Sequence, residues 1–387
     1  MRVLYFSTEF GPHDHRFLAT LAKTPHKVHF LRLATSKRAI EDRPVPAEVE
    51  QLQWAGGKGP FRWRDVPRLQ QDLKRVIKAV QPDLIHAGPI QTCAFLAALS
   101  GFQPILTMSW GFDLMADAER NAWWRWVTRF TLQRSSYFVS DARVTRSRAV
   151  EYGMRPDRTA VFPWGVDLQQ FRPGGIGVSK LRPRPSKSAK RSSHARPHRA
   201  AAEPFALICS RSWEPRYGVD VLARAFVIAA RQHEGLSLIL LAAGSQSNVI
   251  RRILQDGGQV DRVQFGGQVS QAIVPSWYQM AHLYVSPSHV DGSSVSLMEA
   301  LACGMPVLVS DIPANKEWVR DNVNGWLFRD GDAENLADKI LWISSQRSEW
   351  PRISRAARHV AEARADWERN FQVLLRSYNR AVKAAGT

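Results

Sequence analysis

The stretch LYVSPSHVDGSSVSLMEALACGMPVLVS, residues 283–310, contains the pattern that decides the fold. Apolar runs at its two ends, LYVS and PVLVS, predict buried strands. The segment between them predicts an apolar helix that opens near Val295 or Ser296. A strand, a helix and a second strand in this order form the repeating unit of a parallel sheet with helices on its faces.

The same alternation of short apolar runs and helical patterns continues along the chain. Between residues 66 and 80, apolar side chains recur at helical spacing, which predicts a helix packed on a sheet. We therefore predict α/β architecture with doubly wound parallel sheets. The predicted strands are residues 3–6, 28–31, 83–86, 104–107 and 137–140, followed by 205–209, 236–243, 263–265, 283–286 and 306–310.

The segment 174–204 separates the two series of strands. It is rich in Gly, Pro, Ser and basic residues and has no hydrophobic period, which predicts a flexible linker or insertion. We expect a first Rossmann-like domain at 1–172, the linker at 173–204 and a second domain at 205–365. The segment 366–387 is predicted to be a helix that crosses back to the first domain, on an apolar stripe of Trp367, Phe371, Leu374, Leu375 and Tyr378.

Length and composition exclude several classes of protein. The chain has 387 residues, of which 44% are hydrophobic and 23% charged, so it is long enough for two folded domains and is neither disordered nor fibrous. Its three cysteines, Cys93, Cys209 and Cys303, exclude a disulfide scaffold and a cysteine zinc cluster. No apolar run is long enough for a membrane span, and the N-terminus is typical of a core strand, unlike a secretory signal. These features favour a cytoplasmic location.

The net charge of +18 suggests anionic partners. Much of the excess lies in the basic run between Lys180 and Arg199, which contains no acidic residue. A second basic segment, 121–138, places Trp123, Trp124, Trp126 and Phe130 among arginines. This pattern fits an anionic membrane surface with the protein bound peripherally at the cytoplasmic face. It equally fits a helix whose tryptophans pack inward while its arginines are solvated.

Two loops after predicted strands contain candidate ligand-binding residues, because ligands of parallel sheets bind beyond the carboxyl ends of the strands. In the first loop, Gly292, Ser293 and Ser294 lead into a helix, whose N-terminus favours a phosphate. Glu299 on that helix could reach a ribose diol, and Asp291 stands before the turn. The alternative interpretation is a capped helix with acidic residues near its N-terminus.

The second loop follows residues 205–209. Arg211 and Arg216 lie on it before Gly218, so two guanidinium groups could clamp a diphosphate. The alternative is that both arginines lie on the surface over Trp213 and Tyr217.

At these residues the sequence resembles glycosyltransferase family 4, the nucleotide-sugar glycosyltransferases of the GT-B fold. The resemblance covers most of the chain outside the linker. It rests on FGP at 10–12, DLIHAG at 83–88, AVFPWGVDLQQFRP at 160–173, NGWLF at 324–328 and, most specifically, DGSSVSLMEALACGMPVLVSDIPANKEWV at 291–319. It implies two Rossmann-like domains that face each other across a cleft, the first binding the acceptor and the second the nucleotide sugar.

The resemblance implies roles for residues of the second domain. The family's E-x7-E pattern falls on Asp291 and Glu299, so Asp291 would face the transferred sugar as a catalytic residue and Glu299 would bind the donor ribose. Its phosphate-binding arginine falls on Arg211, but its lysine falls on Tyr217, which leaves Arg216 as the substitute. The remaining donor-binding candidates are Gly244, Gly292, Ser293, Ser294 and Val295.

In the first domain the common histidine of the family falls on Trp110. Asp113 is then the nearest ionisable group, and His86, at the end of another predicted strand, is the other catalytic candidate. His86 could equally be a buried, hydrogen-bonded core residue. Gly11 and Trp110 are assigned to the acceptor or donor loops.

The resemblance implies a retaining hexosyltransferase that moves a sugar from a nucleotide-diphosphate donor to a glycan or lipid-linked acceptor in the synthesis of cell-surface polysaccharide or glycolipid. It implies no cofactor and no metal, and we interpret the D-x-D of Asp330 and Asp332 as a helix cap. A nucleotide-sugar epimerase is the enzymatic alternative. Nucleic-acid binding through the linker is disfavoured, because the chain contains no recognised reader module.

Overall fold

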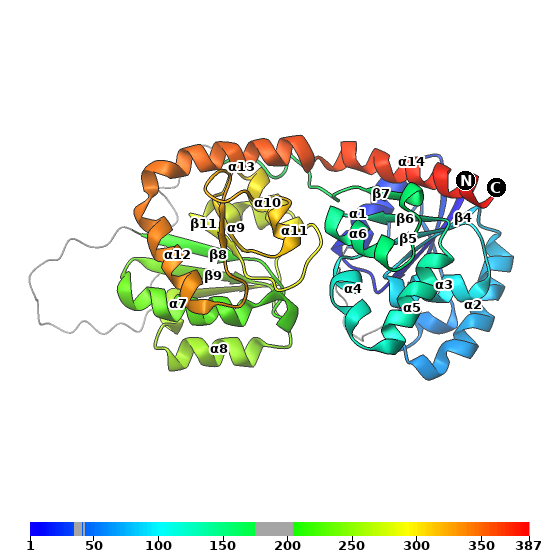
Figure 1. The fold of residues 1–387 in the computed structure, drawn as a ribbon, viewed down its shortest axis with the longest axis horizontal. Coiled ribbons are helices and arrows are strands. Elements are labelled where there is room, and N and C mark those ends of the chain that lie inside the picture. Colours follow the sequence, from blue (N-terminus) through cyan, green and yellow to red (C-terminus); the bar gives the residue numbers. More distant parts are fainter. Residues whose placement is uncertain (35–40, 42, 175–203, 387) are drawn as a thin grey trace, which may run out of the picture. The chain divides into compact units, whose positions relative to one another are not determined.

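The computed structural model describes residues 1–34, 41, 43–174 and 204–386. The chain forms two compact units, which are described separately (Figure 1). The first contains Met1–Pro163 together with the chain from Phe371 onward, and the second contains Trp164–Asn370. No helix in these described ranges is long and apolar enough to cross a membrane.

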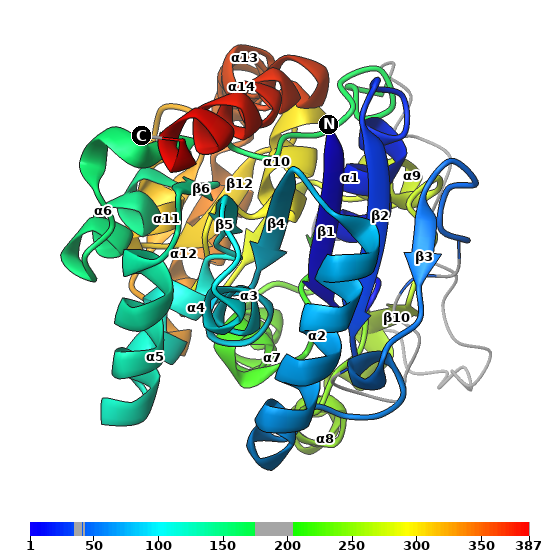
Figure 2. The ribbon, with the colours of Figure 1, turned by 90° about the vertical axis from the view of Figure 1, so that its right-hand side faces the viewer.

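The first unit is built on a sheet of seven described strands in the order β3-β2-β1-β4-β5-β6-β7, all of them parallel (Figure 2). Because β4 pairs with β1 on the side away from β2, the order reverses between β1 and β4, where doubly wound sheets bind ligands. The strands are β1 (Arg2–Thr8), β2 (Lys27–Leu33), β3 (Glu50–Leu52), β4 (Leu84–Gly88), β5 (Ile105–Met108), β6 (Tyr137–Ser140) and β7 (Thr159–Val161).

Helices cover this sheet. The helix predicted from the period at 66–80 is confirmed as α2, which buries Leu69 and Leu73. The others are α1 (Pro12–Leu21), α3 (Phe95–Ser100), α4 (Phe112–Met115), α5 (Ala122–Gln133) and α6 (Arg143–Glu151), with α2 at Val66–Val80.

The second unit has a parallel sheet of six described strands in the order β10-β9-β8-β11-β12-β13. Neighbouring residues of its strands face different cores: Leu207 packs in one cluster and Ile208 in the other, as expected for strands buried on both faces. The strands are β8 (Phe205–Cys209), β9 (Leu236–Leu241), β10 (Val263–Gly267), β11 (Leu283–Ser286), β12 (Val307–Ser310) and β13 (Trp326–Phe328). The helices are α7 (Val219–Gln232), α8 (Ser247–Asp256), α9 (Val274–Gln279), α10 (Val295–Ala302), α11 (Pro313–Lys316), α12 (Ala333–Ser345) and α13 (Trp350–Arg364).

The fold class and all ten predicted strands are confirmed. The three strands that the prediction lacks, β3, β7 and β13, have three residues each and lie at the edges of the sheets. Such short runs, partly exposed in β3 and β7, carry too little periodicity for recognition.

The first boundary lies at Pro163 and Trp164 instead of residue 172. Residues 164–174 belong to the second unit because Val166 N–H donates to the Ala365 carbonyl (2.7 Å) and Trp367 N–H donates to the Val166 carbonyl (3.1 Å). Phe171 is buried in the core of the same unit. Most of the predicted linker, including its basic run, lies outside the described residues.

The final helix, α14 (Trp367–Ala385), belongs to the first unit from Phe371 onward. The Phe371 ring lies 6.3 Å from that of Phe17, and Tyr378 is fully buried. The apolar stripe predicted for this segment thus packs on the unit in which the chain begins.

Candidate functional site

The N-terminus of α10 lies beyond β11, at the carboxyl edge of the second sheet. Ser294 is its N-cap, and the Ser294 hydroxyl accepts a hydrogen bond from Leu297 N–H (3.4 Å). The predicted opening of the helix at Val295 is therefore confirmed. A helix leaves its first N–H groups without intrahelical partners, so Val295 and Ser296 direct amide groups and the positive end of the helix dipole to this edge.

Arg211 lies beyond the end of β8 and contacts the α10 loop. Its Nη1 donates to the hydroxyls of Ser294 (2.7 Å) and Ser296 (3.2 Å), and its Nη2 lies 2.7 Å from Oδ2 of Asp291. Its guanidinium also stacks on the Tyr217 ring at 4.2 Å. Although burial opposes the charged form, the Asp291 carboxylate raises the pKa of Arg211 above its ordinary value. Arg211 is therefore a cation held in a fixed position at the N-terminus of α10.

Asp291 is largely buried beside this arginine. Its Oδ1 accepts a hydrogen bond from Gly292 N–H (3.0 Å), and burial raises its pKa despite the opposing charge of Arg211. The Nε of Arg211 is buried and has no hydrogen-bond partner among the described residues. The guanidinium therefore keeps a donor group for an anionic ligand.

The loop that carries Arg216 and Tyr217 is joined to the loop after β11. The carbonyl of Arg216 accepts hydrogen bonds from the N–H groups of His289 (3.0 Å) and Val290 (3.4 Å), whereas its side chain is exposed. Gly218 has φ +59°, and a Cβ there would lie 2.1 Å from the Pro287 carbonyl oxygen. Only glycine permits this approach of the two backbones. Burial raises the pKa of Asp291, and the charges of Arg211 and Arg216 oppose that rise, so Arg216 also acts on the site.

Glu299 is buried on α10 and already accepts two side-chain hydrogen bonds. Its Oε1 accepts from Nε2 of Gln271 (2.6 Å), and its Oε2 accepts from the hydroxyl of Tyr278 (3.0 Å). The Tyr278 hydroxyl also lies 2.9 Å from Oγ of Ser210, after β8. Gln271 and Tyr278 were not predicted, and no local sequence signal connects them to residue 299.

Gly244 lies in the loop after β9, and Ser293 lies in the loop after β11. A Cβ on Gly244 would lie 2.5 Å from the Trp213 carbonyl, so glycine permits the loops after β8 and β9 to meet. The hydroxyl of Ser293 accepts a hydrogen bond from Nε1 of Trp318 (2.9 Å), which ties the loop after β11 to the one after α11.

A histidine and aspartate pair lies at the same edge and was missed in the sequence. The Nδ1 of His289 lies 2.7 Å from Oδ1 of Asp330, and its Nε2 lies 3.1 Å from where a Cβ of Gly218 would stand. Asp332, in contrast, caps α12 as predicted, since its Oδ1 accepts from Asn335 N–H (2.9 Å). The position of His289 directly after a predicted strand, two residues before Asp291, was the available signal.

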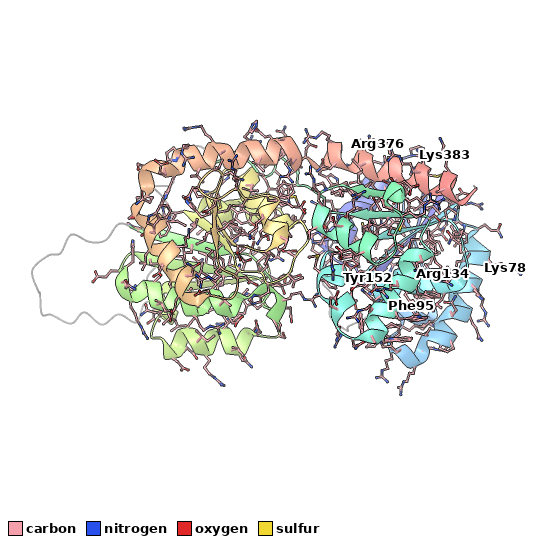
Figure 3. The ribbon with its side chains drawn as sticks, in the orientation of Figure 1. Lys78, Phe95, Arg134, Tyr152, Arg376 and Lys383 are labelled. Atoms are coloured by element: carbon pink, nitrogen blue, oxygen red, sulfur yellow. The ribbon has the colours of Figure 1, made fainter. Side chains whose placement is uncertain are left out.

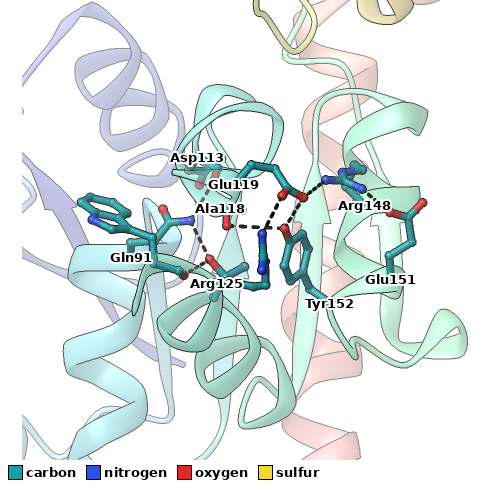
Figure 4. A network of polar contacts seen from close by, with 10 residues as sticks. Gln91, Asp113, Ala118, Glu119, Arg125, Arg148, Glu151 and Tyr152 are labelled. Carbon is teal, nitrogen blue, oxygen red and sulfur yellow. Dashed lines mark hydrogen bonds and ion pairs between the residues drawn. The ribbon is translucent and has the colours of Figure 1, made fainter. Parts of the chain in front are cut away.

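In the first unit, Asp113 connects two loops beyond the sheet, and its main-chain carbonyl accepts a hydrogen bond from Nε2 of Gln91 (2.7 Å) (Figure 4). Its Oδ1 accepts from the Ser109 hydroxyl (2.6 Å) and from the N–H groups of Trp110 (3.1 Å) and Leu114 (3.0 Å), and its Oδ2 accepts from Ile90 N–H (3.1 Å). Asp113 is fully buried, and burial raises its pKa to about 6. All four contacts are with residues of these two loops, so the carboxylate holds the loops together, and the assignment of Asp113 as a catalytic group stays a prediction.

His86 is also a core residue. It lies within β4, is 1% exposed, and its Nδ1 is 2.7 Å from the Tyr378 hydroxyl on α14. Burial lowers its pKa to about 3, so the imidazole is neutral at physiological pH. The alternative interpretation of His86 as a buried, hydrogen-bonded residue is confirmed, and its assignment as a catalytic residue stays a prediction.

Gly11 and Trp110 do lie at the carboxyl edge of the first sheet. Gly11 is the N-cap of α1, and its N–H donates to Oδ2 of Asp14 (3.0 Å). The Trp110 ring lies 6.3 Å from that of His13, on the first turn of α1. His13 was not singled out in the sequence, and it brings an ionisable group to the edge where Asp113 is buried.

Two family models match the chain. The model described as Glycosyltransferase Family 4 matches residues 13–170, and the one described as Glycosyl transferases group 1 matches residues 190–360. The chain belongs to glycosyltransferase family 4. This family 4 enzyme is therefore a glycosyltransferase of the hexosyltransferase type, as the resemblance predicts.

Curated relatives and solved structures agree with this assignment. The enzyme is 24% identical over 292 residues to a Mycobacterium tuberculosis GDP-mannose-dependent alpha-(1-6)-phosphatidylinositol monomannoside mannosyltransferase, covering 73% of this chain and 71% of the relative. It is 30% identical to a D-inositol 3-phosphate glycosyltransferase of Xylanimonas cellulosilytica, covering 63% of this chain and 58% of the relative. Its fold matches that of Anabaena HepE in complex with UDP-glucose, with a TM-score of 0.75, 18% identity and coverage of 98% and 99% of the two chains. The GT-B fold is thereby confirmed. The names of these proteins include GDP-mannose and UDP-glucose, so nucleotide sugars are the class of donor that the comparisons support.

Proposed function

We propose that this enzyme is a retaining glycosyltransferase that moves a sugar from a nucleotide-diphosphate donor to a glycan or lipid-linked acceptor, in the synthesis of cell-surface polysaccharide or glycolipid. The observation that carries the proposal is the convergence of Arg211, Asp291 and the N-terminus of α10. Relatives that glycosylate an inositol phosphate or a phosphatidylinositol mannoside support an acceptor of this class.

The chemistry requires stabilisation of a leaving diphosphate. Negative charge develops on the diphosphate as the bond to the anomeric carbon breaks, and preorganised donors lower that barrier. Arg211 and the first amide groups of α10 supply such donors from fixed positions. In the proposed front-face route, the departing phosphate itself takes the proton of the acceptor hydroxyl.

Asp291 and Glu299 have separate proposed roles. Asp291 holds Arg211 in place and faces the transferred sugar, whereas Glu299 binds the ribose diol. A carboxylate has about four acceptor positions. Glu299 can therefore accept ribose hydroxyls while Tyr278 and Gln271 hold its orientation.

Calorimetric titration with UDP, GDP, ADP and dTDP tests the donor site. We expect one of these nucleotides to bind wild type, and Glu299→Ala to weaken that binding by about ten-fold or more, since a hydrogen bond to a charged group contributes about 1.5–3 kcal/mol. Asp332→Ala is the matched control, because Asp332 caps α12. Unchanged binding in Glu299→Ala would contradict the ribose role.

Product analysis tests the transfer. We expect the donor sugar to appear on an added acceptor with its anomeric configuration retained, and activity to persist in a metal chelator because side chains and a helix dipole supply the positive charge. An epimerised nucleotide sugar formed without any acceptor would instead identify an epimerase.

A further inference from the structure

An aromatic surface of the first unit has no part in the donor site. Trp123 and Trp126, on α5, are 49% and 47% exposed, and their rings stack with centroids 5.0 Å apart. A single exposed tryptophan needs no explanation, but a contiguous exposed apolar patch marks an interaction site.

The patch is continuous across two elements and rests on a third. The Trp63 ring, in the 3-10 turn Trp63–Asp65, lies 5.6 Å from that of Trp123 and 5.8 Å from that of Phe95 on α3. Phe95 in turn lies 6.2 Å from Trp126 and 5.6 Å from Phe130 (Figure 3 labels Phe95). Phe95 is 3% exposed and lies beneath these rings, so we call Trp63, Trp123, Trp126 and Phe130 the aromatic face.

The packing of α5 keeps this face outward. Thr128 and Leu132 are buried on the side of the helix away from Trp123 and Trp126. Arg125 pairs with Glu119 at 3.2 Å, and Glu119 also accepts from the Tyr152 hydroxyl (2.6 Å) (Figure 4). Because these contacts fix the rotation of α5, the exposed tryptophans are a consequence of stable packing.

Four exposed cations border the aromatic face. Lys58, Arg62, Arg64 and Arg68 line a cavity of about 310 Å³, and Asp65 is the one acidic side chain among its described lining residues. None of the four forms an ion pair with another residue in the described part of the chain. The described lining of the cavity therefore carries a net positive charge next to Trp63.

Further arginines lie over the rings themselves. Arg134 lies 3.8 Å from the centroid of Phe130, and Arg120 lies 5.2 Å from that of Trp124 (Figure 3 labels Arg134). Positive charge thus accompanies the aromatic rings along α5 as well as at the cavity.

We propose that this surface docks the enzyme on an anionic lipid bilayer, with Trp123 and Trp126 at the interface and a lipid phosphate in the cavity lined by Lys58, Arg62, Arg64 and Arg68. Tryptophan is enriched where a protein meets the headgroups, and each lysine or arginine near an anionic leaflet contributes about 1 kcal/mol. Trp123 and Trp126 stack on each other, so one face of each exposed indole is already covered and is not open to a nucleic-acid base. The surface deepens the proposed function, since it would bring the enzyme to a lipid-linked acceptor.

Vesicle co-sedimentation of the full chain tests the proposal. Vesicles of phosphatidylcholine alone are compared with vesicles that also contain phosphatidylglycerol, at low and high salt. We expect binding only to the anionic vesicles. Arg62→Ala/Arg64→Ala should weaken it by about five-fold per arginine, which corresponds to about 1 kcal/mol each. Trp123→Ser/Trp126→Ser should weaken it by about ten-fold, because two half-exposed indoles lose their contact with lipid.

Matched controls separate docking from general effects. Trp342→Ser removes a tryptophan of the second unit that is 45% exposed, and Arg252→Ala removes an exposed arginine of α8. Both controls should bind vesicles like wild type. Thermal melts and nucleotide titration of every variant check that folding and the donor site are intact.

Three results would overturn the proposal. The first is that wild type does not bind anionic vesicles. The second is that the control variants lose as much vesicle binding as the test variants. The third is that wild type binds a single-stranded oligonucleotide but no vesicles, and that the same substitutions abolish the oligonucleotide binding. A protein that binds vesicles but no nucleotide would disprove the proposed function and leave membrane docking in place.

Discussion

Arg211 connects its own loop to the distant loop that follows β11. Its guanidinium contacts Asp291, the N-cap Ser294 and the ring of Tyr217, and each contact comes from a loop beyond a strand. Arg211 and Asp291 were predicted as ligand-binding residues because each lies in a loop that follows a predicted strand. The Tyr217 ring, which stands where the family has a lysine, supports the arginine without adding a positive charge.

We expect the side chain of His289 to contribute to diphosphate binding. We expect His289→Asn to weaken the binding of whichever nucleoside diphosphate the enzyme takes by about ten-fold, because its Nε2 lies at the start of α7, where a diphosphate would meet the helix. Titration of the diphosphate and of the bare nucleoside measures this, and the nucleoside should be unaffected.

Asp330→Asn is the comparison for His289. It keeps the imidazole and a hydrogen-bonding partner for Nδ1, so its effect should be smaller than that of His289→Asn. If both variants bind the diphosphate like wild type, the pair only joins two loops.

At the scale of the secondary-structure elements, the loop after β11 restricts the conformation of the turn that leads into α7. Gly218, with φ +59°, follows the 3-10 turn Pro215–Tyr217 and lies against the backbone of the loop after β11. The two loops that carry Arg211 and Asp291 therefore meet without an intervening side chain. This contact keeps the distance between the cation and the α10 N-terminus short.

Gly218→Ala tests this contact. A left-handed conformation costs a non-glycine residue about 1–2 kcal/mol, and the new Cβ would lie 2.1 Å from the Pro287 oxygen, so we expect a larger loss of unfolding free energy together with weaker nucleotide binding. Urea unfolding and titration measure both.

Gly258→Ala is the matched control in the same unit. Gly258 also has a positive φ, +68°, but a Cβ there meets no atom within 4 Å. Gly258→Ala should lose only the unfolding free energy that a left-handed backbone conformation costs a non-glycine residue, about 1–2 kcal/mol, and it should keep its nucleotide affinity. Equal losses in the two variants would show that the contact with Pro287 is unimportant.

At the scale of the whole molecule, the chain ends in the unit where it begins. Tyr378 on α14 places its hydroxyl on His86 of β4, so a residue near the C-terminus is part of the first core. This burial has a consequence for acid stability. Between about pH 6.5 and pH 3 the unfolded chain binds a proton at residue 86 that the native chain does not, so this group lowers stability as the pH falls.

A double variant isolates this effect. We expect His86→Leu/Tyr378→Phe to gain about 2 kcal/mol of unfolding free energy relative to Tyr378→Phe when the pH is lowered from about 6.5 to about 4.5. Urea unfolding of the two variants at each pH measures the difference. Asp14 and Asp113, whose pKa values burial raises to about 6, act in the opposite direction, but they are present in both variants and cancel. A difference independent of pH would contradict the buried, neutral imidazole.

The sequence by itself determined the two series of strands, the helix at 66–80 and the N-terminus of α10. These features depend on local periodicity and capping, which neighbouring residues decide. It also placed Arg211, Asp291 and Ser294 at strand ends, because topology alone brings those ends to one edge of a sheet.

Only the tertiary structure decided the remaining contacts. Glu299 meets Gln271 and Tyr278, His289 meets Asp330, and His86 meets Tyr378 across 292 positions of sequence. Periodicity contains no information about such pairs. Whether a titratable side chain is a catalytic group or a buried hydrogen-bonding residue depends on its solvation, which the packing of distant elements determines.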